Sequence, residues 1–401
     1  MTARQRTRIL VVDDSVVMRS LLRSVFATDA GLEVAASAAD GESALRAVED
    51  VRPDLLLLDV EMPVMDGLAT LRELRARGHK MPVIMCSSLT RRGARVTIEA
   101  LAGGASDYVA KPVGQSGREA AIQALAKDLI PKIHALTGRL QGQPQPAFSG
   151  PRSPCGSGCM PGAGSGFGFG PGVGPVAARL PLPLPQVHKP QPVSSIPTVL
   201  TIGVSTGGPA ALDLVLPGLP ADFPLPVMIV QHMPEMFTRL FAERLNGRCR
   251  LRVHEATEGE PVVAGAVYVA RGDWHMEVLA ASRAGAPATL HLNRDPFENH
   301  CRPSADVLFR SAARVYGSGV LAVVLTGMGS DGLMGCRAIR EHGGSVLAQD
   351  EATSAVWGMP GAVVHAELAQ KVLPLHSMTL EILRIVSRTQ SEAQELREPA
   401  V

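Results

Sequence analysis

The sequence contains few aromatic residues and no long apolar run. Aromatic side chains make up only 3% of the 401 residues, although 46% of the residues are hydrophobic. The cores of a folded chain must therefore consist mainly of valine, leucine, isoleucine, alanine and methionine. No apolar stretch approaches the ~20 residues that cross a bilayer, and the short run before Asp13 is too brief for a signal peptide. We therefore expect a globular protein of the cytoplasm that does not insert into a membrane.

The sequence also lacks an excess of charge of either sign and a clustered set of cysteines. The formal net charge is +1, which gives no electrostatic argument for nucleic acid or an anionic lipid surface as a partner. The six cysteines are scattered, and no four of them have the spacing of a zinc site. This usage is typical of a protein from a reducing compartment.

Composition divides the chain into four parts. A segment at 139–197 is dense in proline, glycine and serine and cannot bury enough apolar surface to offset its ordering entropy, so we predict a flexible linker. Cys155 and Cys159 lie within it and are most simply two isolated thiols without a metal or redox role. The other predicted parts are a first domain at 1–138, a second domain at 198–388 and a disordered tail at 389–401.

Short apolar runs alternate with helical patterns in both predicted domains, which indicates α/β folds built on parallel sheets. In the first domain the predicted strands are 8–12, 33–36, 55–59, 83–87 and 108–110, and the predicted helices are 16–27, 41–50, 67–77, 94–102 and 118–134. In the second domain the predicted strands are 199–204, 227–230, 267–269 and 320–325, and the predicted helices are 209–216, 235–246, 304–315 and 333–342. The second fold is expected to be a doubly wound parallel sheet, with a small antiparallel hairpin within 262–293.

Acidic and polar residues follow the predicted strands of the first domain. They are Asp13, Asp14, Asp59, Ser87 and Lys111, and sites of open parallel sheets form at these strand ends. Crowded carboxylates repel one another and need a cation, and oxygen ligands favour Mg²⁺. A carboxylate beside Mg²⁺ can accept a phosphoryl group, whose oxygens a hydroxyl and an ammonium can hold. The alternative is that the acids are only helix caps, which would explain one of them but not the whole set.

Three motifs of the first domain resemble those of response-regulator receiver domains. They are Val-Val-Asp-Asp-Ser at 11–15, Leu-Leu-Asp-Val-Glu-Met-Pro-Val-Met-Asp-Gly at 57–67 and Tyr-Val-Ala-Lys-Pro at 108–112. The resemblance covers residues 8 to about 135 and implies a flavodoxin-like (βα)5 fold. It further implies that Asp59 accepts phosphate from a chemotaxis histidine kinase and that Mg²⁺ is held by Asp13, Asp14, Asp59 and the backbone carbonyl of Glu61. It also implies phosphoryl contacts from Ser87 and Lys111, a switching aromatic at Tyr108 and a cis Lys111–Pro112 bond.

A glycine-rich turn follows the first predicted strand of the second domain. Its sequence is Gly-Val-Ser-Thr-Gly-Gly-Pro at 203–209, and it contains the G-x-S-x-G pattern of a nucleophile elbow. Glycines permit a tight strand-to-helix turn that exposes the Ser205 hydroxyl. The same turn would suit a phosphate-binding loop, or a serine that only caps the next helix.

A histidine and an aspartate complete a catalytic pattern in the second domain. His232 follows the strand at 227–230, and Asp331 follows the strand at 320–325. Alone, His232 would more often be structural and Asp331 an N-cap. With Ser205 they supply a nucleophile, a general base and an orienting carboxylate.

Five motifs of the second domain look like those of chemotaxis protein-glutamate methylesterases. The chain order Ser, His, Asp differs from that of α/β-hydrolases, whereas this family has the same order. The motifs are Ile-Gly-Val-Ser-Thr-Gly-Gly-Pro at 202–209, Val-Gln-His-Met-Pro at 230–234, Arg-Pro-Ser-Ala-Asp at 302–306, Leu-Thr-Gly-Met-Gly-Ser-Asp-Gly at 325–332 and Trp-Gly-Met-Pro at 357–360.

The resemblance implies a reaction on methylated cytoplasmic helices of chemoreceptors. γ-Glutamyl methyl esters would be hydrolysed to glutamate and methanol, and glutamines would be deamidated, without a cofactor for the ester chemistry. Ser205, His232 and Asp331 would be catalytic, and the backbone N–H groups of Thr206 and Met328 would hold the oxyanion. We further expect the unphosphorylated receiver to cover part of the site around Ser205 and His232.

Two other functions fit parts of the pattern. One is a non-enzymatic regulator whose glycine loop binds a phosphate ligand. The other is a general esterase for small molecules, which the low aromatic content argues against because small-substrate pockets are commonly lined by aromatic side chains.

Overall fold

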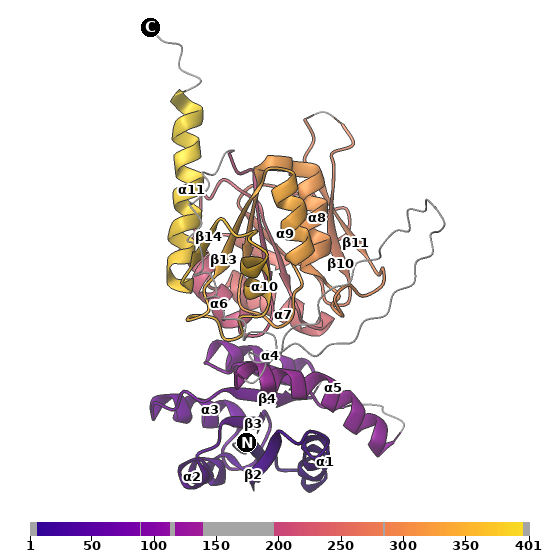
Figure 1. Cartoon of the computed structure of the whole chain (residues 1–401), viewed down its shortest axis with the longest axis vertical. Coiled ribbons are helices and arrows are strands. Elements are labelled where there is room, and N and C mark those ends of the chain that lie inside the picture. The colour runs from indigo at the N-terminus through magenta and orange to yellow at the C-terminus, as the bar shows by residue number, and fades with distance from the viewer. Residues whose placement is uncertain (1–5, 89, 113–116, 139–195, 284, 396–401) are drawn as a thin grey trace, which may run out of the picture. The chain divides into compact units, whose positions relative to one another are not determined.

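The structure is a computed structural model that describes residues 6–88, 90–112, 117–138, 196–283 and 285–395 (Figure 1). Nearly all of the predicted linker, with Cys155 and Cys159, lies outside the described residues, as does the end of the predicted tail. None of the helices in the described ranges is long and apolar enough to cross a membrane.

The first domain is a five-stranded parallel sheet with the strand order β2-β1-β3-β4-β5. Its elements are β1 (Thr7–Val12), α1 (Val16–Phe26), β2 (Leu32–Ala38), α2 (Gly41–Val51), β3 (Leu55–Asp59), α3 (Gly67–Ala76), β4 (Val83–Ser87), α4 (Arg91–Ala102), β5 (Asp107–Ala110) and α5 (Arg118–Leu136). The central strand β3 is buried along its whole length. This burial explains its uninterrupted leucines, because helices cover both faces of such a sheet. The predicted (βα)5 fold is confirmed.

Helix α4 begins three residues before its predicted start. Thr90 is its N-cap, and the Thr90 hydroxyl accepts a hydrogen bond of 3.0 Å from the backbone N–H of Gly93. A threonine followed by two arginines has no apolar periodicity, so hydrophobic pattern alone placed the start too late.

The second domain is a seven-stranded parallel sheet with the strand order β14-β13-β12-β6-β7-β9-β8. Its first half contains β6 (Val199–Val204), α6 (Gly208–Val215), β7 (Val227–Gln231), α7 (Glu235–Asn246), β8 (Arg252–Glu255) and β9 (Ala266–Val269). An antiparallel pair comes next, formed by β10 (His275–Leu279) and β11 (Thr289–Asn293). The second half of the domain contains α8 (Ala305–Tyr316), β12 (Val320–Val324), α9 (Leu333–Glu341), β13 (Ser345–Gln349), α10 (Met359–His365), β14 (Lys371–Leu373) and α11 (Leu375–Glu395). The doubly wound sheet and the hairpin are confirmed.

Several elements near the end of the second domain were not predicted. The strand β14 has only three residues, and β13 is a short buried run that was overlooked. Helix α11 continues to Glu395, so the predicted start of a tail at residue 389 differs from the structure. The last residues of α11 include alanine, glutamine and glutamate, which favour helix without any need for a core contact.

Helix α8 packs closely against strand β6, which carries the glycine-rich turn. A Cβ atom at Gly203 would lie 2.9 Å from the Cβ atom of Ala305 and 3.1 Å from the ring of Phe309. The first glycine of the G-x-S-x-G pattern is therefore required by helix packing. Phe309 is completely buried at this contact.

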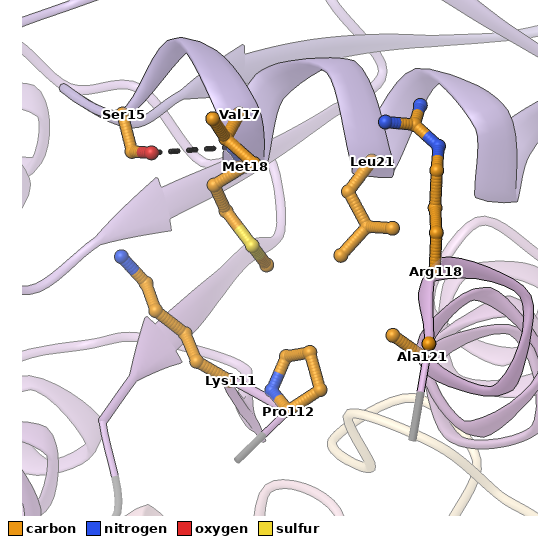
Figure 2. A pocket seen from close by; sticks show the side chains of 9 residues that line it. Ser15, Val17, Met18, Leu21, Lys111, Pro112, Arg118 and Ala121 are labelled. Atoms are coloured by element: carbon orange, nitrogen blue, oxygen red, sulfur yellow. Dashed lines mark hydrogen bonds between the residues drawn. The ribbon is translucent and has the colours of Figure 1, made fainter. Parts of the chain in front are cut away.

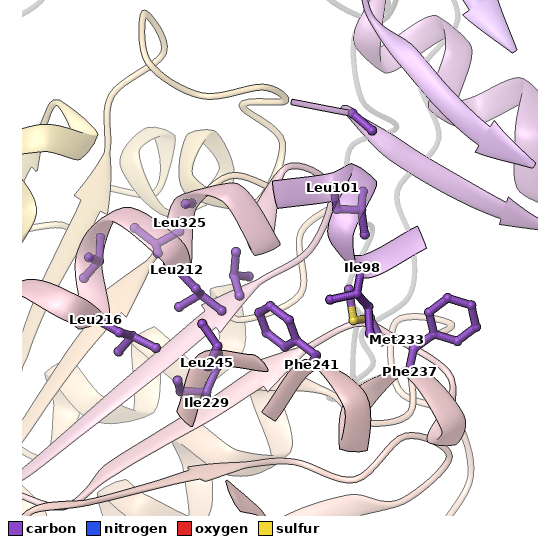
Figure 3. Packing of buried hydrophobic residues seen from close by; sticks show 14 of the residues in the cluster. Ile98, Leu101, Leu212, Leu216, Ile229, Met233, Phe237, Phe241, Leu245 and Leu325 are labelled. Carbon is purple, nitrogen blue, oxygen red and sulfur yellow. The ribbon is translucent and has the colours of Figure 1, made fainter. Parts of the chain in front are cut away.

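The two domains belong to one packed unit, in which α4 of the first domain contacts α6 and α7 of the second. Ile98 and Leu101 of α4 join a cluster with Met233, Phe237 and Phe241 (Figure 3). The contact is apolar at its centre, so the apolar side chains on this face of α4 are buried away from water.

The packing of α8 gives a stability prediction. Phe309→Ala should lower the free energy of unfolding of the second domain by about 3–5 kcal/mol, because it removes a buried ring and leaves a cavity. Phe297 is 59% exposed and serves as the matched control; Phe297→Ala should change this free energy by less than about 1 kcal/mol. Urea unfolding of both variants measures the difference, and equal effects would contradict the assigned packing.

Candidate phosphorylation and active sites

The acidic residues of the first domain meet a lysine at the carboxyl end of the sheet. Asp13 and Asp59 are almost fully buried after β1 and β3. The ammonium of Lys111, just after β5, lies 2.8 Å from the Asp13 carboxylate and 2.7 Å from the Asp59 carboxylate. Ser87 is buried at the end of the neighbouring strand β4. The structure therefore brings these predicted side chains into one pocket.

The alternative that these acids are only helix caps does not fit. Ser15 is the N-cap of α1, and Asp66 is the N-cap of α3. Asp13 accepts a hydrogen bond from the backbone N–H of Ser15, and its second oxygen faces Lys111. Asp59 ends a strand and caps no helix.

Burial and the neighbouring lysine have opposite effects on Asp59. Burial favours the neutral carboxyl and outweighs the bonds to Lys111, so the pKa of Asp59 is raised to about 6. Lys111 is half-buried; its partial burial lowers its pKa, but the bonds to Asp13 and Asp59 outweigh this effect and raise the pKa above the usual value. A further cation would relieve the crowding of acids. One carboxylate oxygen each from Asp13, Asp14 and Asp59 can be chosen within 4.8 Å of one another, which suits a small cation with oxygen ligands.

The Lys111–Pro112 bond was predicted to be cis, and this prediction is wrong. Within the described ranges the cis peptide bond lies between Arg302 and Pro303. The Lys111 ammonium reaches both carboxylates without the cis isomer, because its flexible stem can adjust. A cavity of about 500 Å³ lies beside Lys111 and Pro112 and is bordered by Met18 and Leu21 of α1. Figure 2 shows these side chains.

The glycine-rich turn of the second domain depends on a glutamine from the next strand. Gly207 has a φ of +78°, which favours glycine. A Cβ atom at Gly208 would lie 2.0 Å from the side-chain oxygen of Gln231. The amide nitrogen of Gln231 donates a hydrogen bond of 3.0 Å to the carbonyl of Ser205. Glycine is therefore required at position 207 by the backbone conformation and at position 208 by the nearby Gln231 side chain. The hydrogen bond from Gln231 stabilises the turn.

Strand register brings Ser205 and His232 to neighbouring positions. Val204 of β6 pairs with Gln231 of β7, so the two residues leave adjacent parallel strands at the same edge. The backbone N–H of His232 also donates to the carbonyl of Val204. Within the described part of the chain, the Ser205 hydroxyl makes no hydrogen bond.

His232 is paired with Asp331 as predicted. Its Nε2 atom lies 2.8 Å from an oxygen of Asp331, and its Nδ1 atom lies 3.6 Å from the sulfur of Cys301. Burial disfavours the charged ring, but the bonds to Asp331 and Cys301 outweigh this effect and raise the pKa of His232. Since Nε2 is occupied by the carboxylate, Nδ1 is the nitrogen that remains for proton transfer.

Asp331 is a buried carboxylate at the N-terminus of α8. It accepts hydrogen bonds from the Ser304 hydroxyl at 2.6 Å, the backbone N–H of Ala305 at 2.6 Å and the side chain of Asn299 at 2.9 Å. Burial opposes ionisation, but the bonds from His232, Ser304 and Ala305 hold the pKa of Asp331 well below its usual range. Asp331 therefore binds the start of α8, whereas α9, the helix that follows it, has Gly332 as its N-cap.

Four supporting residues were not identified from the sequence. Ser304 lies inside a motif that had been noted, so its role could have been suspected. Gln231 adjoins His232 in another such motif. Asn299 and Cys301 lie in a loop with no recognisable pattern, and only the folded structure shows their contacts.

The predicted oxyanion donors, the backbone N–H groups of Thr206 and Met328, have no acceptor in the described part of the chain. The Thr206 hydroxyl donates at 2.6 Å to Asp107 of the first domain. Thr206 thus lies beside Ser205 and contacts the first domain at the same time.

Comparison with known families assigns both domains. Residues 9–124 match the response regulator receiver domain, and residues 200–382 match the CheB methylesterase domain. The catalytic domain of the Thermotoga maritima CheB methylesterase covers 48% of this chain with 39% identity and a TM-score of 0.46, and all of that domain is aligned. A receiver joined to such a domain defines a response-regulator hydrolase.

Full-length relatives give the family. A protein-glutamate methylesterase/protein-glutamine glutaminase of Nocardioides is 46% identical over 95% of this chain and 96% of the relative. One of Trichodesmium erythraeum is 41% identical over 94% of this chain and 98% of the relative. The chain belongs to the protein-glutamate methylesterase/protein-glutamine glutaminase family, and the resemblance drawn from the motifs is confirmed.

The raised pKa of Asp59 predicts a pH-dependent effect of Asp59→Asn. A raised folded-state pKa gives stability that is complete below about pH 4 and is lost as the pH rises through about 6. The neutral amide avoids this loss, so Asp59→Asn should stabilise the receiver by about 1–2 kcal/mol at pH 8, a value reduced for solvent screening, and by much less at pH 4.

Urea unfolding at the two pH values measures this difference. Asp50→Asn is the matched control because Asp50 is exposed, and it should have little effect at either pH. A stabilisation by Asp59→Asn that is the same at both pH values would contradict the burial argument.

Proposed function

We propose that this chain hydrolyses γ-glutamyl methyl esters, and deamidates glutamines, on the cytoplasmic helices of chemoreceptors. Ser205, His232 and Asp331 carry the reaction. The observation that supports this most directly is the His232–Asp331 pair, at the strand end next to the Ser205 turn. The names of the full-length relatives supply the substrate class.

Ser205 is the nucleophile in this proposal. Its hydroxyl oxygen attacks the ester carbonyl while Nδ1 of His232 takes the proton. Methanol leaves with that proton, and water then hydrolyses the glutamyl-enzyme by the same route. Asp331 holds the ring through Nε2 and stabilises the imidazolium. Its own charge is stabilised by the N-terminus of α8, so it stays ionised during the cycle.

The oxyanion of the tetrahedral intermediate is held by the backbone N–H groups of Thr206 and Met328. Both groups lack another acceptor within the described residues. Donors held in place before the reaction stabilise developing charge more than water does, because they need no reorganisation. The esterase chemistry in this proposal uses no metal.

Asp59 is the phosphoryl acceptor in this proposal, with a histidine kinase as the donor. Mg²⁺ would be held by Asp13, Asp14, Asp59 and the backbone carbonyl of Glu61, and when bound it neutralises charge on the phosphoryl oxygens. The backbone N–H of Glu61 bonds the Asp59 carboxylate, which supports its place in the pocket. Ser87 and Lys111 would contact the phosphoryl group.

The unphosphorylated receiver restrains the catalytic domain in this proposal. Asp107 accepts a hydrogen bond from Thr206, the residue after the nucleophile. The ring of Tyr108 stacks on Phe237 of α7 at a centroid distance of 4.6 Å. Both receiver residues belong to β5, which leads directly to Lys111 of the phosphorylation pocket. Movement of Lys111 towards a phosphoryl group on Asp59 would therefore act on the strand that holds Thr206.

The nucleophile assignment predicts the effect of Ser205→Ala. The variant should lose about 10⁶-fold in turnover and keep its thermal unfolding midpoint, since the half-buried hydroxyl that is removed makes no hydrogen bond within the described residues. Methanol release from methylated receptor membranes measures the loss. Ser24→Ala, in α1 of the receiver, is the control and should retain full activity. A loss of less than about tenfold in the Ser205 variant would exclude Ser205 as the nucleophile.

The interdomain contact predicts activation by changes in the receiver. Asp107→Ala should raise the rate of methanol release by the unphosphorylated chain, and so should removal of residues 1–197. The expected increase is ~5- to 150-fold, which corresponds to a coupling free energy of about 1–3 kcal/mol between the domains. Asp128→Ala is the matched control, because Asp128 also pairs with Lys132 but makes no contact with Thr206.

The same assay is repeated after treatment with a small phosphodonor. Phosphorylation should activate the wild type more than the Asp107 variant, since that variant has already lost part of the restraint. If neither the fragment nor Asp107→Ala exceeds the untreated wild type, the receiver does not act by occlusion. It would then act by recruiting the enzyme to its substrate.

A further inference from the structure

A thiol that the proposed reaction does not use lies against the catalytic base. The sulfur of Cys301 is 3.6 Å from Nδ1 of His232, and Nε2 of the same ring is 2.8 Å from Asp331. Thiol, imidazole and carboxylate therefore form one chain of hydrogen-bonding groups. The sulfur lies at Nδ1, the nitrogen that accepts the Ser205 proton in the function proposed above.

The position of Cys301 is fixed by a tight turn. The backbone groups of Glu298 and Cys301 exchange hydrogen bonds of 3.1 Å and 2.8 Å. Between them Asn299 and His300 have φ values of +51° and +63°, which non-glycine residues adopt only when the surroundings impose them. The side chain of Asn299 donates to Asp331, so one turn positions both the thiol and the carboxylate around His232.

The other cysteines of the described chain have a different environment. Cys86 and Cys336 are fully buried, and Cys249 is half-buried. Burial raises the pKa of all three thiols, which keeps them in the unreactive protonated form. No hydrogen bond joins any of these three sulfurs to a histidine within the described ranges. Cys301 is half-buried, and its sulfur has two partners, the imidazole of His232 and the backbone carbonyl of Asn299, to which the thiol donates at 3.4 Å.

We propose that Cys301 is a peroxide-modified thiol whose oxidation disables His232; this effect on activity rests on the function proposed above. The proton of the thiol moves to Nδ1, which leaves a thiolate beside an imidazolium. The sulfur attacks one oxygen of hydrogen peroxide, the O–O bond breaks and an S–O bond forms. The departing hydroxide takes the imidazolium proton and becomes water. Sulfur loses two electrons, the peroxide gains them, and the product is the sulfenic acid of Cys301.

Oxidation places an additional polar oxygen between Cys301 and the ring. The S–OH group can donate to Nδ1, the same nitrogen that must accept the Ser205 proton. The oxidised enzyme therefore loses its base while its fold and its receiver are unchanged. A thiol reductant reverses the reaction by forming a mixed disulfide with loss of water, and a second reductant thiol then releases Cys301 as the free thiol.

The test uses the full chain with Cys155 and Cys159 replaced by serine, in buffer with a chelator to remove metal ions. Peptide mass spectrometry after limited hydrogen peroxide, followed by a sulfenate-trapping reagent, measures which thiol reacts first. Cys301 should react at least about tenfold faster than Cys249, the matched half-buried thiol. Methanol release, measured on the same samples, should fall in proportion to Cys301 oxidation and return with dithiothreitol.

Two variants separate the thiol from the esterase. Cys301→Ser should keep its own untreated activity, whatever its level, after the same peroxide dose. His232→Gln should slow alkylation of Cys301 by iodoacetamide by about tenfold or more, because the proton acceptor is removed. This second measurement needs no esterase activity and so is independent of the proposed function.

The outcomes distinguish the two proposals. Equal rates for Cys301 and Cys249, or no effect of His232→Gln on alkylation, would overturn the assignment of a reactive thiol. Fast oxidation of Cys301 without loss of methanol release would overturn its effect on the base. If the unoxidised chain releases no methanol at all, the proposed function fails, whereas fast His232-dependent alkylation would still support the reactive thiol.

Discussion

The buried carboxylate of Asp331 is the group on which the catalytic domain depends. A charge in this position is stable only because the first turn of α8, Ser304, Asn299 and His232 all donate to it. These donors lie in separate parts of the chain. The first turn of α8 can donate to Asp331 only because α8 packs closely on β6. Gly203 permits that approach, so the requirement for glycine beneath Ser205 follows from the need to bring the start of α8 to the buried Asp331 carboxylate.

The receiver also contains buried carboxylates, but a different partner stabilises them. Its buried acids face the ammonium of Lys111, and no helix N-terminus supplies their principal partner. The two carboxyls differ in pKa, because burial of Asp59 outweighs its bonds to Lys111. Asp331 is held ionised, whereas the pKa of Asp59 is raised to about 6. The first environment suits a carboxylate that must orient a base without reacting, and the second suits a carboxylate that exchanges partners during signalling.

Much of both sites could be predicted because parallel strands collect their ends at one edge. Once the strands were recognised, Asp13, Asp59 and Lys111 had to be neighbours, as did Ser205 and His232. The sequence could not reveal contacts made by irregular segments. The turn that holds Asn299 and Cys301 has two residues in a conformation that local propensity disfavours, and the bond from Thr206 to Asp107 joins residues 99 positions apart. The short strand β14 was missed because three residues carry too little periodicity.

Strand β5 illustrates how little sequence separates the two chemistries. Asp107 and Tyr108 contact the second domain, and Lys111 follows one residue after the strand ends. One short segment therefore contributes both to the acidic pocket of the receiver and to the contact with the second domain. The apolar side chains of Ile98 and Leu101 on α4 contact the second domain from outside this segment, so the strength of the domain contact can vary at these positions while Lys111 keeps its place.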